Sequence, residues 1–211
     1  MERIVTRDYR IFGRPLWSSV KTNCVQMSFP LFDEQKEDVI KKLGKKPDAG
    51  VPIDKESINF KVSSWLLMDF HAEVCANRGV EIMEHVCGLD FSDFLTWERL
   101  NRFNLSVQNA LFVKGEASSN LTSLIHIENH GYILTGWVHN HTGNGEGSVH
   151  PSGTDIKNQK ALEVGNYAAV GAIFSQDGFI RFFSDRLKFN VEILGKGVQK
   201  VGENLYRIAK T

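Results

Sequence analysis

The run GWVHNH (residues 136–141) and the run PSGTDI (residues 151–156) decide how this chain is interpreted. His139 and His141 lie two residues apart at the end of an alternating apolar stretch, residues 132–139, which is typical of a β-strand. Side chains alternate between the two faces of a strand, so both imidazole rings are expected on the same face. Imidazole nitrogen binds zinc at about 2.0–2.1 Å, and two such groups on one face can share an ion.

A third ligand has to come from elsewhere, and the second run offers Asp155. The glycine-rich residues 142–153 indicate a loop, and residues 155–164 have the pattern of a helix. Ser152 precedes Asp155 by three residues, where its hydroxyl can cap the start of that helix. Two histidines and one carboxylate leave a fourth tetrahedral position for water, which distinguishes a catalytic zinc site from a structural one. The sequence therefore predicts a catalytic zinc site made of the two histidines and Asp155.

Together the two runs resemble the signature of the JAMM metalloproteases of the JAB/MPN family, which is His-x-His, a short loop and then Ser-x-x-Asp. The resemblance covers residues 58–195. It implies an α+β fold with a curved mixed β-sheet flanked by helices, of the JAB/MPN and cytidine-deaminase-like kind. The family also has a glutamate on an earlier strand, seven residues before a glycine, and Glu81 stands at this distance from Gly88.

The sequence departs from the family's pattern in three places. Thr142 and Glu84 stand where proline and glycine are common in the family, and the loop between the second histidine and the serine is longer than usual. A longer loop costs little when its ends stay anchored. Two residues of this loop, Glu146 and His150, are further candidates for contact with metal or substrate.

The resemblance also implies a mechanism of hydrolysis. A zinc ion lowers the pKa of a bound water to about 7. Glu81 would take the proton of that water and pass it to the leaving amine. Ser152 would donate a hydrogen bond to the oxyanion of the tetrahedral intermediate. Glu84, on the opposite face of the strand, is the alternative base, and Glu116 is a weaker candidate.

The rest of the chain has an α+β order. Apolar residues at helical spacing predict a helix over residues 65–76. Shorter apolar runs predict strands over residues 58–62, 80–89, 111–113, 167–174, 179–183, 189–194 and 198–208. Residues 121–128 alternate, so they are expected to form a hairpin with residues 132–139. The Asp-Gly pair at 177–178 predicts a second hairpin, between 167–174 and 179–183.

Residues 1–55 differ from the rest of the chain. Residues 33–46 are rich in charge and have an apolar spacing that suits a short helix, and residues 48–52 are typical of a turn or linker. We therefore divide the chain into an N-terminal extension of unassigned fold, residues 1–55, and a metalloprotease domain, residues 56–211.

The composition limits the classes of partner and location. The 25 basic and 25 acidic residues cancel, which argues against a nucleic-acid partner. Three widely spaced cysteines do not make a disulfide framework. No run approaches the roughly 20 apolar residues of a membrane span, and the first residues lack the pattern of a signal peptide. These features predict a cytoplasmic protein that does not contact the membrane.

The resemblance implies a zinc-dependent peptidase or isopeptidase of the bacterial deubiquitinase-like kind. Such an enzyme removes a ubiquitin-like modifier from its conjugates or processes the modifier's C-terminal tail. Two alternatives stay open. The run His-Asn-His with Pro-Ser-x-x-Asp-Ile also resembles RadC-type proteins of the same fold, which are linked to DNA metabolism. A metal-free module that only binds partners is the third interpretation, and the sequence does not indicate an oligomeric state.

Overall fold

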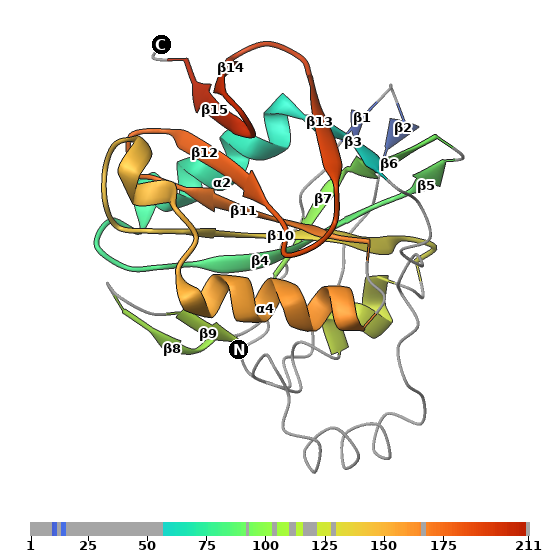
Figure 1. Cartoon of the computed structure of the whole chain (residues 1–211), viewed down its shortest axis with the longest axis horizontal. Helices are drawn as coiled ribbons and strands as arrows, with labels where there is room; N and C mark the ends of the chain where they lie inside the picture. The colour runs from blue at the N-terminus through green and yellow to red at the C-terminus, as the bar shows by residue number, and fades with distance from the viewer. Residues whose placement is uncertain are drawn as a thin grey trace.

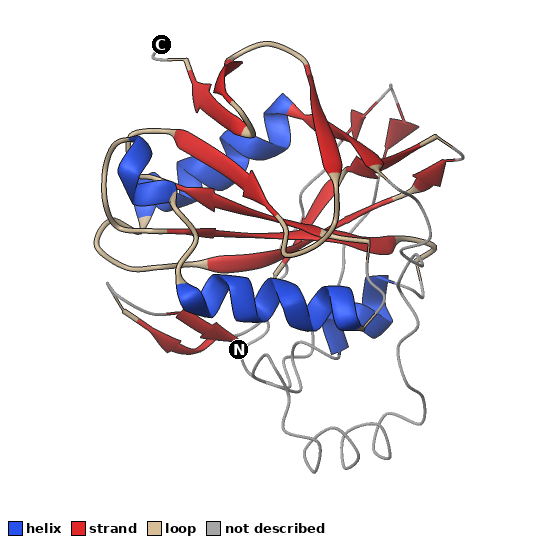
Figure 2. Cartoon of the chain, viewed as in Figure 1, coloured by secondary structure: helices blue, strands red, loops and turns tan. Residues whose placement is uncertain are grey.

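The computed structural model describes residues 10–11, 14–15, 57–91, 93–102, 105–109, 113–115, 122–127, 130–165 and 168–209. Within these ranges strands predominate, and the two longest helices are α2 (Ser64–Ala76) and α4 (Gly153–Val164) (Figure 2). No helix in this part of the chain combines the length and the apolar character needed to cross a membrane. The helix predicted over residues 33–46 lies outside the described residues, as do Glu116 and residues 111–112 of a predicted strand.

The larger sheet has seven strands and carries the run GWVHNH near its centre. Its order is β14 (Val198–Gly202), β15 (Leu205–Ile208), β12 (Phe179–Phe183), β11 (Val170–Phe174), β10 (Ile133–Asn140), β4 (Met83–Gly88) and β7 (Arg99–Asn101). β10 runs parallel to β11 and antiparallel to β4. His139 is therefore flanked by Ile173 on one neighbouring strand and by Met83 on the other.

A second sheet of four strands has the order β13 (Phe189–Leu194), β3 (Ile58–Ser63), β6 (Phe94–Trp97) and β5 (Asp90–Phe91). Two short pairs complete the strands: β8 (Leu105–Gln108) with β9 (Val113–Gly115), and β1 (Arg10–Ile11) with β2 (Arg14–Pro15). β3 leads directly into α2, so one short segment joins the second sheet to the helix that covers the first.

α2 and α4 cover opposite faces of the larger sheet (Figure 1), and a hydrophobic core lies between each helix and the sheet. Apolar residues of α2, such as Phe70, pack with Val138 of β10 in one core. Leu162 of α4 packs with Trp137 of β10 in the other. Because side chains alternate along β10, His139 faces the same side as Trp137, which is the side of α4.

Most of the predicted elements are present, and the α+β class is confirmed. The strand predicted over residues 80–89 begins later, at Met83, so that Glu81 precedes it. The hairpin around Asp177-Gly178 is formed by β11 and β12 as predicted. Residues 198–208 make two antiparallel strands, β14 and β15, in place of one.

The strand predicted over residues 121–128 is wrong, because residues 122–127 are helical. Both neighbours of β10 are supplied by other strands, β4 and β11, so no edge of β10 is left to pair with this segment. The segment instead buries Leu124 and Ile127, three residues apart, in the core on the α4 face. That spacing belongs to a helix face.

Gly88 ends β4 and lies against the backbone of β6. A methyl group at this position would overlap the carbonyl oxygen of Thr96, which cannot move aside as a side chain can. Gly88→Ala is therefore expected to lower the free energy of unfolding by about 3 kcal/mol, near the upper end of the usual cost of overpacking. Urea denaturation measures this, with Gly153→Ala as the control because the space around Gly153 is open. Equal midpoints for the two variants would contradict the packing of β4 on β6.

Candidate metal centre

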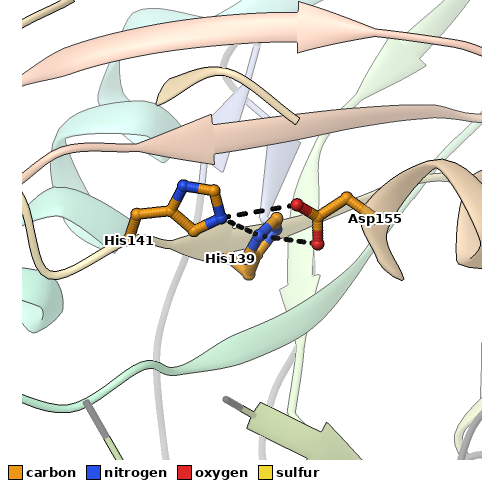
Figure 3. A group of neighbouring side chains, drawn as sticks. All are labelled: His139, His141 and Asp155. Atoms are coloured by element: carbon orange, nitrogen blue, oxygen red, sulfur yellow. Dashed lines mark hydrogen bonds and ion pairs between the residues drawn. The ribbon is translucent and has the colours of Figure 1, made fainter. Parts of the chain in front are cut away.

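The two histidines and Asp155 come together at the end of β10. Asp155 lies in the first turn of α4, and its carboxylate is directed at both imidazole rings (Figure 3). Nε2 of His139 lies 3.2 Å from Oδ1 of Asp155, and Nε2 of His141 lies 3.4 Å from Oδ2. The two Nε2 atoms are 3.1 Å apart. The structure thus joins all three residues that the sequence predicts as metal ligands.

The donor atoms of this group suit a divalent metal ion. One ligand atom from each residue lies within 4.8 Å of the others, and two imidazole nitrogens with one carboxylate oxygen are a usual donor set for catalytic zinc. His141 donates its Nδ1 hydrogen to the carbonyl oxygen of Ser148 over 2.6 Å. A neutral His141 therefore turns the lone pair of Nε2 toward a carboxylate, and a proton or a cation is needed between these two acceptors. The residues fit a metal ion at this point.

α4 holds the inner histidine as well as supplying the aspartate. The ring of Trp137 stacks on the ring of His139, with centroids 4.9 Å apart. Trp137 Nε1 donates to Oε1 of Gln159 over 2.8 Å, and Gln159 Nε2 donates to Glu163 and to the carbonyl oxygen of Ala169. Asp155, Gln159 and Glu163 are spaced four residues apart, so one buried face of α4 orients the site.

Ser152 caps α4 and fixes the orientation of Asp155. The amide of Asp155 donates to Ser152 Oγ over 3.3 Å, and the amide of Ser152 donates to Asp155 Oδ2 over 2.6 Å. This reciprocal pair is a capping box with aspartate at the third helical position. The Ser152 hydroxyl acts in it as an acceptor, so its own hydrogen is not used by the cap, and the side chain is exposed. The predicted cap is confirmed, and the oxyanion role of Ser152 stays a prediction.

The long loop after His141 is anchored to the β11–β12 turn. Gly145 donates its amide hydrogen to Oδ1 of Asp177 over 2.8 Å, and Val149 is fully buried. The loop is therefore held on this turn, while Asp155 still reaches both histidines. Glu146 forms an ion pair with Arg181, and neither it nor the exposed His150 belongs to the three-residue donor group.

Glu81 lies just before β4 and beside the metal centre. It is 8 % exposed, and its amide donates to the carbonyl oxygen of Asn109 over 2.8 Å. Burial raises the pKa of Glu81 to about 7, while the charge of His141 lowers it and that of Asp155 raises it. The carboxylate is thus near enough to two of the donor residues to interact with their charges.

Glu84 lies on the other face of the sheet. It pairs in register with Val138 of β10, whose side chain is in the α2 core. Arg102 Nε donates to its carboxylate over 2.7 Å, and the same arginine forms an ion pair with Glu73 of α2. This placement favours Glu81 over Glu84 as the base.

The pKa shifts of the three donor residues favour the binding of a cation. Burial raises the pKa of Asp155, but hydrogen bonds from His139 and His141 outweigh this and hold it well below its usual range. Burial lowers the pKa of His139 below its usual value, although Asp155 opposes this. Burial also lowers the pKa of His141, but hydrogen bonds to Asp155 and Ser148 bring it above its usual value. The group therefore combines a carboxylate held in its charged form, an imidazole that loses its proton more readily than usual and an imidazole that loses it less readily.

Metal affinity is expected to fall as the pH is lowered, because His141 must lose a proton to bind through Nε2. Its pKa in the metal-free chain is raised, so proton competition begins closer to neutral pH than for an ordinary histidine. Below that pKa, log Kd should rise by at least about one for each unit that the pH falls, and it should level off above it. Zinc titrations against a competing chelator between about pH 5 and 8 measure this. A constant Kd over this range would exclude His141 as a ligand.

The fold and the site define an α+β protein with a two-histidine, one-carboxylate group suited to a divalent metal. No family model matches the sequence, and no curated protein matches it. Among solved structures, the chain is similar to a JAB1/MPN domain protein from Archaeoglobus fulgidus, with 14% identity, a TM-score of 0.40, and 64% of this chain and 99% of that chain covered.

It is also similar to a protein from Desulfitobacterium hafniense, known from a solution structure, with 13% identity and a TM-score of 0.45. That likeness covers 64% of this chain and 94% of the other. The first of the two proteins is named for the fold that the sequence resembles.

Proposed function

We propose that this chain is a zinc-dependent hydrolase that cleaves an amide or isopeptide bond at the C-terminal tail of a ubiquitin-like modifier. One observation carries the proposal: the donor atoms of His139, His141 and Asp155 converge while a buried glutamate, Glu81, lies beside them. A site that only stores a metal has no need of a nearby carboxylate with a pKa of about 7, whereas general acid–base catalysis does.

Each residue of the site has a part in this chemistry. His139, His141 and Asp155 would hold the ion, which as a bound Lewis acid polarises the scissile carbonyl and lowers the pKa of water to about 7. Glu81 accepts a proton from the attacking water and returns it to the leaving amine. Its burial favours proton uptake, and the positive charge of a bound ion opposes it, so the carboxylate is available as a base at neutral pH. Ser152 donates its hydroxyl hydrogen to the developing oxyanion.

A groove beside the start of α4 supports a polypeptide substrate. Its volume is about 450 Å³, and Pro151 and Ile156, which flank the capping box, form part of its wall. Arg181 and Phe183 of β12 line it further. Because Pro151 and Ile156 are the sequence neighbours of Ser152 and Asp155, a chain segment bound in this groove would lie beside the start of α4. The ubiquitin-like identity of the substrate and a cytoplasmic location rest on the sequence resemblance and composition, and are proposed on that ground.

Metal analysis and hydrolysis of the full chain test the proposal. The purified protein is expected to bind about one zinc per chain and to release fluorophore from a ubiquitin-like protein whose Gly-Gly terminus carries a fluorogenic amide. A chelator should stop the release, and added zinc should restore it. A chain that binds no zinc after addition of the ion would refute the proposal.

The same preparation decides between the alternatives. Zinc binding without hydrolysis of any amide or isopeptide probe would favour a binding module. Zinc-dependent cleavage of DNA, without cleavage of the amide probe, would favour the RadC-type interpretation.

A further inference from the structure

Asn140 stands between the two histidines and points to the opposite face of the strand end. Its side chain is fully buried. Oδ1 accepts a hydrogen bond from the amide of Ile82 over 2.6 Å, and Nδ2 donates to the carbonyl oxygen of Val80 over 3.2 Å. The backbone amide of Asn140 donates to the carbonyl oxygen of Ile82 over 3.3 Å. All three bonds reach one short segment, residues 80–82.

That segment is the one that carries Glu81. The regular pairing of β4 with β10 ends at Met83 and His139, so residues 80–82 lie beyond the last pair of the ladder. The side-chain amide of Asn140 offers the same donor and acceptor as a peptide group, and so it bonds the segment where the strand no longer can. It bonds the residue before Glu81 and the residue after it, while the Glu81 amide itself bonds Asn109.

We propose that Asn140 is a positioning residue, which sets the Glu81 carboxylate against the metal centre by bonding the backbone on both sides of it. This inference rests on the proposed hydrolytic function. The two ligand histidines and Asn140 share one rigid strand end, so the same three consecutive residues fix the metal and the base relative to each other. A displacement of a catalytic group by about 1 Å can cost about 100-fold in rate.

If Asn140 only stabilised the fold, its replacement would have the same effect as the loss of any other buried amide. Loss of any buried amide that is hydrogen-bonded lowers stability by leaving its partners unsatisfied. Asn101 on β7 is a matched case, because it is buried, donates to Ser123, and pairs in register with His85 of β4, three residues beyond Ile82. Asn101→Ala therefore removes a buried amide without touching residues 80–82.

The experiment compares Asn140→Ala and Asn140→Asp with Asn101→Ala in the full chain. Asn140→Ala is expected to lower kcat about 100-fold, with KM and zinc affinity changed less than about threefold. Asn140→Asp keeps the acceptor for the Ile82 amide and loses the donor to Val80, so its kcat should lie between wild type and Asn140→Ala. Asn101→Ala should keep the kcat of the wild type.

Amide hydrogen exchange of the zinc-free protein gives a second readout, which does not depend on hydrolysis. The Ile82 amide should lose its protection in Asn140→Ala and keep it in Asn101→Ala. If the alanine variant does not fold, kcat is measured on the aspartate variant instead, whose Ile82 amide keeps its acceptor. A kcat of the measured variant within about threefold of wild type, or an equal fall of zinc affinity and kcat, would overturn the proposal, and so would unchanged protection of Ile82 in Asn140→Ala. If the wild-type protein hydrolyses no probe, the proposed hydrolytic function is refuted. The exchange measurement then tests only whether the Asn140 side chain bonds residues 80–82.

Discussion

His139→Ala is expected to lower the affinity of the chain for zinc by more than 100-fold. Even residues that only orient a ligand cost about 10- to 100-fold when they are replaced, and His139 supplies a ligand atom itself. Its Nε2 lies 3.2 Å from Asp155 and 3.1 Å from His141, so the remaining two donors would have to hold the ion without their inner neighbour. Competition with a chelator of known affinity measures the change.

The control for this variant is His150→Ala. His150 lies in the loop between the ligands but is exposed and is not part of the donor group, so its loss should leave zinc affinity unchanged. Asp155→Asn is a second variant, since the amide keeps an oxygen for the Ser152 amide while removing the charge. Asp155→Asn should weaken zinc binding because the negative charge is lost. The helix cap should change less than zinc binding, because the side-chain oxygen still accepts the hydrogen bond from the Ser152 amide. Equal losses for His150→Ala and His139→Ala would show that the ligands are assigned wrongly.

The metal ligands could be predicted because they are close together in the sequence. A strand, a loop and a helix contain all three, and the periodicity of each element fixes which face a side chain takes. His139 and His141 share a face by strand alternation, and Ser152 marks the start of α4 by its capping chemistry. The longer loop between them is anchored on the β11–β12 turn through Asp177, and Asp155 still reaches both histidines.

The residues that support the site could not be predicted in this way. Gln159 and Asn140 are polar and fully buried, and their partners are distant in the sequence or are backbone groups. The signal for Gln159 is present in its spacing, four residues from both Asp155 and Glu163 on one helix face. That spacing is informative only when the face is known to be buried.

The pairing of strands that are distant in the sequence is the second feature that could not be predicted. Local alternation predicts a strand over residues 121–128, but whether a strand forms depends on an available edge, and the neighbours of β10 come from remote segments. In the same way, β3 pairs with β13, so residues 58–63 lie beside residues 189–194. Nothing in either segment indicates the other.

Glu81→Gln is expected to retain zinc and to lose hydrolysis by a factor of about 10² to 10⁴, the usual contribution of a general acid–base group. Glutamine has the shape of glutamate and leaves the backbone bonds of Glu81 in place, but its amide cannot accept a proton at neutral pH. Zinc affinity should change little, because Glu81 is not one of the three donors. Metal content and kcat, measured on one preparation, test both halves of the expectation.

Glu98→Gln separates the chemistry of Glu81 from the burial of a carboxyl group. Glu98 is also a buried glutamate with a pKa raised by burial, but it lies beside Cys87, near the end of β4 that is remote from His139. If a buried acid only mattered for stability, both variants would shift the unfolding midpoint and neither would change kcat of the folded protein. If Glu81 moves the proton, only Glu81→Gln loses kcat while the zinc stays bound. A Glu81→Gln variant that hydrolyses the probe at the wild-type rate would leave the site as a metal-binding site and remove the argument that it is catalytic.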